Sequence, residues 1–240
     1  MSGMTLQEWL ISTQTGNTIL ELEKKWINQI LAKWFGSYLL HIGEVGAGQF
    51  WENSRISRHA LITSNIIKQT DICATFDELP FASESVDCVI LPHVLETVSE
   101  PLNVLKEIER ILIADGHLIV LGFNPYSASG VWRMAGAWRT MQSAPPRFYS
   151  QRQLQLWLLD LGFEIVGNYH GFCRPPIDNS TWFQKLQWME KLSFISNIYG
   201  LAIQKRRLII PTPLLRRERK PRWANVPEPT VLRHDNDPTR

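Results

Sequence analysis

Two continuous apolar runs, VDCVIL at 86–91 and HLIVLGF at 117–123, constrain the fold of this chain most strongly. An uninterrupted apolar run is typical of a strand that is buried on both faces, whereas a strand with one face in water alternates apolar and polar residues. Between the two runs, residues 99–116 have apolar side chains at helical spacing, with Pro101 in the first turn and Gly116 as the expected stop. This order of strand, helix and strand predicts a mainly parallel sheet with helices on both faces.

The same alternation extends over most of the chain. An amphipathic helix is expected at 19–35, and further helices at 49–57 and 150–162. Further strands are expected at 37–42, 59–64, 70–76, 163–171 and 197–204. Ligands of such sheets bind beyond the carboxyl ends of the strands, so residues that directly follow a strand are the first candidates for a site.

A glycine-rich turn, HIGEVGAG at 41–48, follows the first expected strand. Glycines let the backbone approach a ligand without collision of a Cβ atom. The spacing of Gly43, Gly46 and Gly48 does not match the GxGxxG turn of dinucleotide-binding proteins, and no Lys-Ser/Thr pair follows it as in a P-loop. The turn is expected either to hold a nucleotide-like cofactor of another kind or to be a tight connection without a ligand.

Composition excludes several other classes of protein. The three cysteines form no metal-binding pattern, and we expect Cys73 and Cys88 to be reduced thiols in the core, because both fall in expected strands. The N-terminus lacks the pattern of a signal peptide, and no apolar stretch is long enough to span a bilayer. We therefore expect a soluble, cytoplasmic protein with no metal site and no transmembrane segment.

The blocks after the glycine turn resemble those of class I S-adenosylmethionine-dependent methyltransferases of the type 11-like kind, in order and in spacing. They read FDELPF (76–81), SVDCVIL (85–91), PHVLE (92–96), EPLNVLKEIERIL (100–112) and ADGHLIVLGFNP (114–125). More narrowly, PHVLE together with GHLIVLGFNPYS resembles an uncharacterised proteobacterial branch with a degenerate glycine motif. The resemblance implies a Rossmann-like α/β methyltransferase fold, with a central seven-stranded, mostly parallel sheet, helices on both faces and an antiparallel last strand.

The resemblance also implies the cofactor S-adenosyl-L-methionine and the residues that would hold it. The glycines would shape the cofactor turn, Ser64 would lie at the ribose, and Pro92 would lie at the reactive end. The full expected set is His41, Gly43, Glu44, Gly46, Gly48, Ser64, Thr75, Phe76, Pro92 and His93. No catalytic residue follows from the motifs except His93, which is either a general base for the methyl acceptor or a structural histidine at a helix start. Glu96 is expected to be structural.

Three positions depart from the family pattern. His41 replaces the acid that begins the turn, where Glu44 either compensates or is solvated. Ser64 and Asn65 stand where an acid usually binds the ribose, and Thr75 replaces an Asp. Because charge-assisted hydrogen bonds contribute roughly twice the ~1 kcal/mol of neutral ones, loss of the ribose acid lowers affinity about tenfold or more. Two functions therefore stay open: methyl transfer to an unidentified, small-molecule acceptor, or a catalytically silent binding or regulatory protein on a methyltransferase fold.

The chain is expected to have three parts: an N-terminal helical segment at 1–36, a methyltransferase-like domain at 37–205 and a basic, proline-rich tail at 206–240. Within the domain, a lid or insertion is expected at 124–148 and a second insertion at 175–195. Residues 205–222 hold eight Lys and Arg against one acid, so this segment is a solvated tail or contacts nucleic acid or an anionic surface. RNA methylation guided by the tail is a third, weaker alternative.

Overall fold

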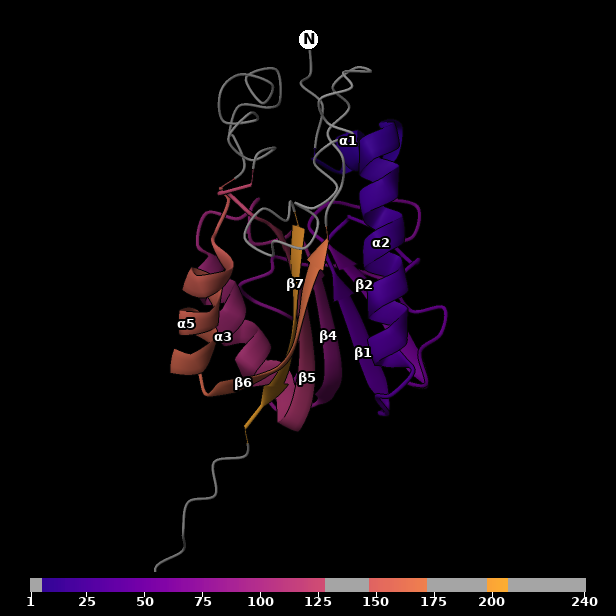
Figure 1. The fold of residues 1–240 in the computed structure, drawn as a ribbon. Helices are drawn as coiled ribbons and strands as arrows, with labels where there is room; N and C mark the ends of the chain where they lie inside the picture. Colours follow the sequence, from indigo (N-terminus) through magenta and orange to yellow (C-terminus); the bar gives the residue numbers. More distant parts are fainter. Residues whose placement is uncertain (1–5, 128–146, 172–197, 207–240) are drawn as a thin grey trace, which may run out of the picture. The chain divides into compact units, whose positions relative to one another are not determined.

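The computed structural model describes residues 6–127, 147–171 and 198–206 (Figure 1). The chain divides into two units, residues 1–207 and 208–240, and all described residues lie in the first.

Several expected segments fall outside the described residues. These are the insertion at 175–195, most of the lid at 124–148, the tail after Arg206, and Cys173. The boundaries expected for these segments stay predictions.

Seven strands form one sheet in the order β3-β2-β1-β4-β5-β7-β6. The strands are β1 (Tyr38–Ile42), β2 (Arg58–Thr63), β3 (Ile72–Cys73), β4 (Val86–Pro92), β5 (Leu112–Phe123), β6 (Phe163–Gly171) and β7 (Ile198–Lys205). The pairs among β1 to β5 are parallel, and β7 lies antiparallel between β5 and β6. The Rossmann-like methyltransferase fold is therefore confirmed, including its antiparallel last strand.

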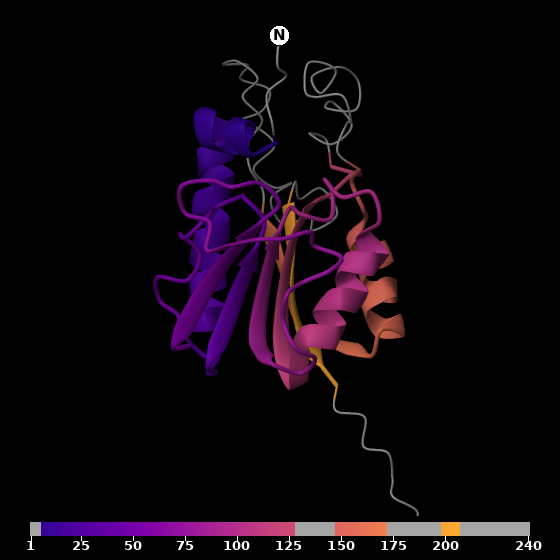
Figure 2. The ribbon, with the colours of Figure 1, turned by 180° about the vertical axis from the view of Figure 1, so that it is seen from behind.

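Helices cover the two faces of this sheet (Figures 1 and 2). Helices α1 (Leu6–Ser12) and α2 (Gln14–Leu31) pack on one face, with apolar residues of α2 against side chains of β1 and β4. Helices α3 (Pro101–Ile111) and α5 (Gln151–Asp160) pack on the other face. The sheet is buried from both sides, which is why its central strands are continuous apolar runs in the sequence.

Two of the helices begin at a residue whose side chain caps them, whereas Glu100 at the start of α3 makes no such hydrogen bond. The Thr13 hydroxyl accepts a hydrogen bond from Gly16 N at 3.0 Å and so caps α2. The Ser150 hydroxyl accepts one from Gln153 N at 3.2 Å, and so caps α5 as its sequence predicts. None of the helices among the described residues is long and apolar enough to cross a membrane.

Three expected elements are wrong in detail. Residues 49–57 form turns and not a helix, because the buried Phe50 and the neighbouring Trp51 pack their rings against histidines and so replace a periodic apolar face. Helix α3 ends at Ile111, and β5 begins directly after it, so Gly116 lies within the strand and does not stop the helix. β3 has only two residues and lies at the edge of the sheet, which leaves Cys73 exposed, while Cys88 is buried as expected.

Candidate functional site

A pocket of about 480 Å³ lies at the carboxyl ends of the parallel strands. Its lining includes seven of the ten residues that the sequence predicted for a cofactor: Gly43, Glu44, Ser64, Thr75, Phe76, Pro92 and His93. His41, Gly46 and Gly48 do not line it. Asn65, which the sequence placed with Ser64 at the ribose position, lines the pocket as well. Asp77, Val98 and Leu6 of α1 also line it, and sequence reasoning did not assign these three to a site. The pocket lies where the carboxyl ends of parallel strands place ligands.

The glycine turn is shaped by close packing. A Cβ atom at Gly43 would lie 2.4 Å from Val94 Cγ2, and one at Gly46 would lie 2.4 Å from the Phe50 ring. Gly43 also has a φ of +108° and donates its N–H to Ile62 O at 2.8 Å. At Gly48 a Cβ would meet nothing closer than 3.9 Å, so only its φ of +75° favours glycine there. Of the three glycines, only Gly43 reaches the pocket.

His41 is completely buried, and its side chain binds the backbone of the glycine turn. Its Nε2–H donates to Val45 O at 3.0 Å, and its ring stacks on Phe50 with 5.5 Å between the ring centroids. Burial, which outweighs the bond to Val45, lowers the pKa of His41 from 6.5 to about 4. At the position where the family has an acid, this chain has a neutral histidine that supports the backbone of the turn.

Replacing His41 is expected to change the acid sensitivity of the fold. The folded pKa of His41 lies below the ordinary value, so its contribution to stability is present above pH 6.5 and is lost as pH falls toward 4. The free energy of unfolding should fall by up to about 1.4 kcal/mol per pH unit over that window. In His41→Gln, the amide can still donate to Val45 O but does not titrate. The contribution of His41 to the pH dependence of the free energy of unfolding should therefore be lost. Urea unfolding at pH 4.5, 5.5 and 6.5 measures it, and equal slopes in both proteins would contradict the assignment.

Glu44 brings a carboxylate to the end of β2. Its Oε1 lies 3.3 Å from Asn65 Nδ2, which also lies 3.3 Å from the Ser64 hydroxyl oxygen. The turn after β1 thus places an acid beside the two neutral residues that follow β2, where the sequence has none of its own. Phe76 and Val98 supply apolar side chains to another part of the pocket lining.

His93 lies between two buried carboxylates. It is 1% exposed, and its backbone is left-handed with a φ of +53°. Its Nε2–H donates to Glu23 Oε1 at 2.8 Å, and its Nδ1–H donates to Glu96 Oε1 at 3.3 Å. Glu96 Oε1 also accepts the Phe123 N–H at 3.0 Å, and the Phe123 ring stacks on the imidazole at 4.2 Å.

These contacts determine the charge of His93. Burial by itself lowers the pKa of His93, but the charge and hydrogen bond of Glu23, together with those of Glu96, raise it to about 10. A ring whose two N–H groups both donate has no free lone pair for a substrate proton. The arrangement therefore favours the structural alternative for His93 over the general base.

Motif reasoning missed Glu23, the buried partner of His93, because it lies 70 residues before His93 in the sequence. One signal was present. Glu23 falls on the apolar face of its helix, four residues after Ile19 and four before Ile27, both of which are buried. A charged residue at such a position is rarely buried unless it has a partner. Among the described residues, no group of three or more His, Cys, Asp and Glu side chains is placed to hold a metal ion.

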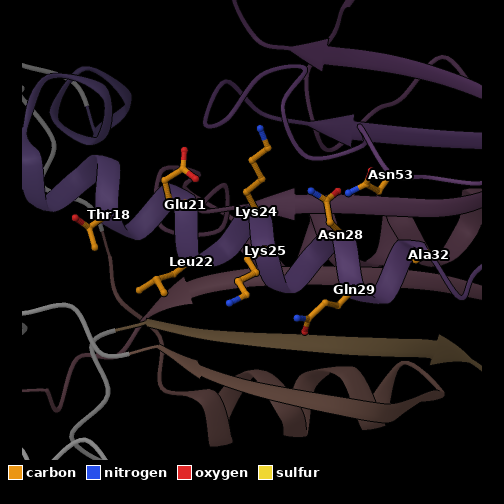
Figure 3. Close-up of a pocket in the computed structure, with 9 residues that line it drawn as sticks. All are labelled: Thr18, Glu21, Leu22, Lys24, Lys25, Asn28, Gln29, Ala32 and Asn53. Carbon is orange, nitrogen blue, oxygen red and sulfur yellow. The ribbon is translucent and has the colours of Figure 1, made fainter.

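A second hollow, of about 750 Å³, lies along the surface of α2 (Figure 3). It is lined by Thr18, Glu21, Leu22, Lys24, Lys25, Asn28, Gln29, Ala32 and Asn53. None of these residues follows a strand, and none belongs to the set that the sequence predicted. The smaller pocket at the strand ends is therefore the candidate site.

Comparisons with known proteins agree with this geometry. Residues 45–120 match the methyltransferase domain family. The uncharacterised protein YafS of Escherichia coli (strain K12) is 33% identical over 141 residues, which are 58% of this chain and 58% of YafS, so the chain spans little more than half the length of this relative.

Two solved structures show the same fold. The S-adenosylmethionine-dependent methyltransferase of Archaeoglobus fulgidus has a TM-score of 0.59 at 15% identity, over 78% of this chain and 94% of that chain. One from Thermotoga maritima has a TM-score of 0.55 at 19% identity, over 79% and 92%. The matched residues 45–120 run from the glycine turn into β5 and include much of the pocket lining. The chain is therefore similar to the methyltransferase domain family over residues 45–120, and it has the same Rossmann-like fold as these two solved structures.

Proposed function

We propose that this protein transfers a methyl group from S-adenosylmethionine to a small-molecule acceptor. The observation that carries the proposal is the pocket at the strand ends, which collects residues from five separate segments: Gly43, Ser64, Phe76, Pro92 and Leu6 among them. Its volume of about 480 Å³ falls within the range of small-molecule sites, roughly 300–1,000 Å³.

The residues present fit a nucleoside with a charged tail. Glu44, Ser64 and Asn65 form a polar edge for the ribose hydroxyls, and Phe76 and Val98 form an apolar surface for the adenine. Pro92 and His93 line the part assigned to the reactive end. When bound, S-adenosylmethionine supplies an activated methyl group on a sulfonium. The task of the chain is then to align the acceptor with that group and to exclude water.

Calorimetric titration tests the proposal directly. S-adenosylmethionine and S-adenosylhomocysteine should each bind one site per chain and should raise the melting temperature, whereas NAD should do neither. No response at millimolar ligand would overturn the proposal. Incubation with S-adenosylmethionine and an extract of cellular small molecules should then release S-adenosylhomocysteine, which mass spectrometry detects.

Glu44→Gln is expected to weaken S-adenosylhomocysteine binding about tenfold, because a charge-assisted hydrogen bond to a ribose hydroxyl becomes a neutral one. The matched control is Glu52→Gln. Glu52 is also close to the turn in sequence, but its carboxylate pairs with Lys24 at the surface and does not line the pocket. Equal affinities for the two variants would remove Glu44 from the site.

A second function, a silent binding or regulatory protein, is favoured by one observation. The acid positions of the family hold His41, which is buried inside the turn, and Ser64 and Asn65, which are neutral. Saturable binding of S-adenosylhomocysteine without methyl transfer to any component of the extract would support this second function.

A further inference from the structure

A buried ion cluster joins the N-terminal helices to the pocket. Glu23 of α2, His93 after β4 and Glu96 form it, and the Glu23 and His93 side chains are both 0% exposed. His93 lines the pocket, and so does Leu6 of α1. The segment before residue 37, which the sequence set apart from the methyltransferase domain, therefore contributes Leu6 to the pocket lining and supports the lining residue His93 through Glu23.

The surroundings of the cluster make its charge unusual. Two carboxylates face one imidazole, and the Oε2 atoms of Glu23 and Glu96 are buried without a hydrogen-bond partner among the described residues. Tyr169 of β6 lies near Glu23 and Tyr199 of β7 near Glu96. In both tyrosines burial first, and then the nearby carboxylate, raises the pKa.

Stability of the fold alone does not account for this buried ion cluster. Buried ion pairs can often be replaced by apolar side chains with no loss of stability, because desolvation of the charges offsets their attraction. The cluster does, however, fix two features that apolar side chains would leave free. These are the orientation of the His93 ring and the positive charge of that ring beside the pocket.

We propose that Glu23 is a positioning residue of the pocket, which through its bond to Nε2 fixes the His93 ring and keeps it protonated. The left-handed turn at His93 follows Pro92 directly, so the ring and the turn are held together as one wall of the pocket. This assignment rests on the proposed function only for the identity of the ligand. It also explains why an acid is placed on the buried face of α2.

The experiment compares Glu23→Gln with Glu21→Gln, an exposed acid on the same helix (Figure 3). The Gln side chain keeps an oxygen that can accept from Nε2–H but removes the charge. Nitrogen-15 NMR of the histidine rings reads the protonation of His93 without any ligand. Calorimetry with S-adenosylhomocysteine at pH 8 reads the pocket.

In the wild type and in Glu21→Gln, the His93 ring should carry both protons at pH 8. In Glu23→Gln, its titration should move down by one pH unit or more, and S-adenosylhomocysteine should bind at least tenfold more weakly. A loss of thermal stability alone would move neither the ring signals of the folded protein nor its affinity.

Three other outcomes distinguish the role of Glu23 from the proposed methyl transfer. A neutral His93 ring in the wild type at pH 8 would overturn the role of Glu23, whether or not the variant folds. Unchanged affinity in Glu23→Gln, with binding intact in the wild type, would overturn that role and leave the proposed function standing. Absence of binding in the wild type would overturn the proposed function, and the ring signals would still show whether Glu23 holds His93.

Discussion

Gly43→Ala is expected to lower the free energy of unfolding by about 3 kcal/mol or more. Two effects add. The backbone φ of +108° disfavours any side chain, which costs about 1–2 kcal/mol. The new methyl group would also lie 2.4 Å from Val94 Cγ2, and overpacking of a buried site costs about 1–3 kcal/mol. Val94 is 3% exposed and belongs to the core, so it cannot move away without displacing its neighbours.

Gly162→Ala is the matched control. Gly162 also has a positive φ, +83°, but a Cβ there would meet nothing within 4 Å. Its loss should be limited to the backbone effect of about 1–2 kcal/mol. Urea unfolding of the two variants measures the difference, and S-adenosylhomocysteine titration should show weaker binding in Gly43→Ala only, because Gly43 and Val94 both line the pocket. Equal losses in the two variants would show that the turn can relax around the extra methyl group.

His93→Asn should destabilise the protein by about 3–5 kcal/mol, because it leaves the Glu23 and Glu96 carboxylates buried without a cation. Asparagine tolerates the left-handed backbone at this position, so the loss measures the charge more than the φ of +53°. The triple variant that adds Glu23→Gln and Glu96→Gln should recover much of the loss, since no uncompensated charge remains. A triple variant that is no more stable than the single one would contradict the ionic character of the cluster.

The same residue should give the fold an alkaline sensitivity. The folded pKa of His93, about 10, is above the ordinary 6.5, so its contribution to stability is complete below pH 6.5 and is lost as pH rises toward 10. The free energy of unfolding should fall by up to about 1.4 kcal/mol per pH unit over this window. Among the described residues, Glu23 and Glu96 act on His93, while Tyr169 lies near Glu23 and Tyr199 lies near Glu96. Unfolding curves at pH 7, 8 and 9 should show this slope in the wild type and lack it in His93→Asn.

Much of the fold could be predicted, because its central strands are buried on both faces and some of its helices begin at recognisable capping residues. The apolar runs at 86–91 and 117–123 became β4 and the end of β5, and Ser150 caps α5. The errors lie where tertiary contacts override local pattern. Residues 49–57 are held by aromatic packing and not by a helical face, and Gly116 is accommodated by a register shift between β4 and β5.

The sequence by itself determined the order of the elements and the chain positions from which the pocket is lined, because residues that follow parallel strands meet at one edge of the sheet. Only the tertiary structure decided which side chains face one another there. The Glu44 carboxylate lies beside Asn65, and Val94 leaves no room for a Cβ atom at position 43. His93 is bound by Glu23, which lies in a helix 70 residues earlier. Helical spacing shows that Glu23 is on a buried face, but its partner depends on how α2 packs across the sheet, and no local pattern contains that information.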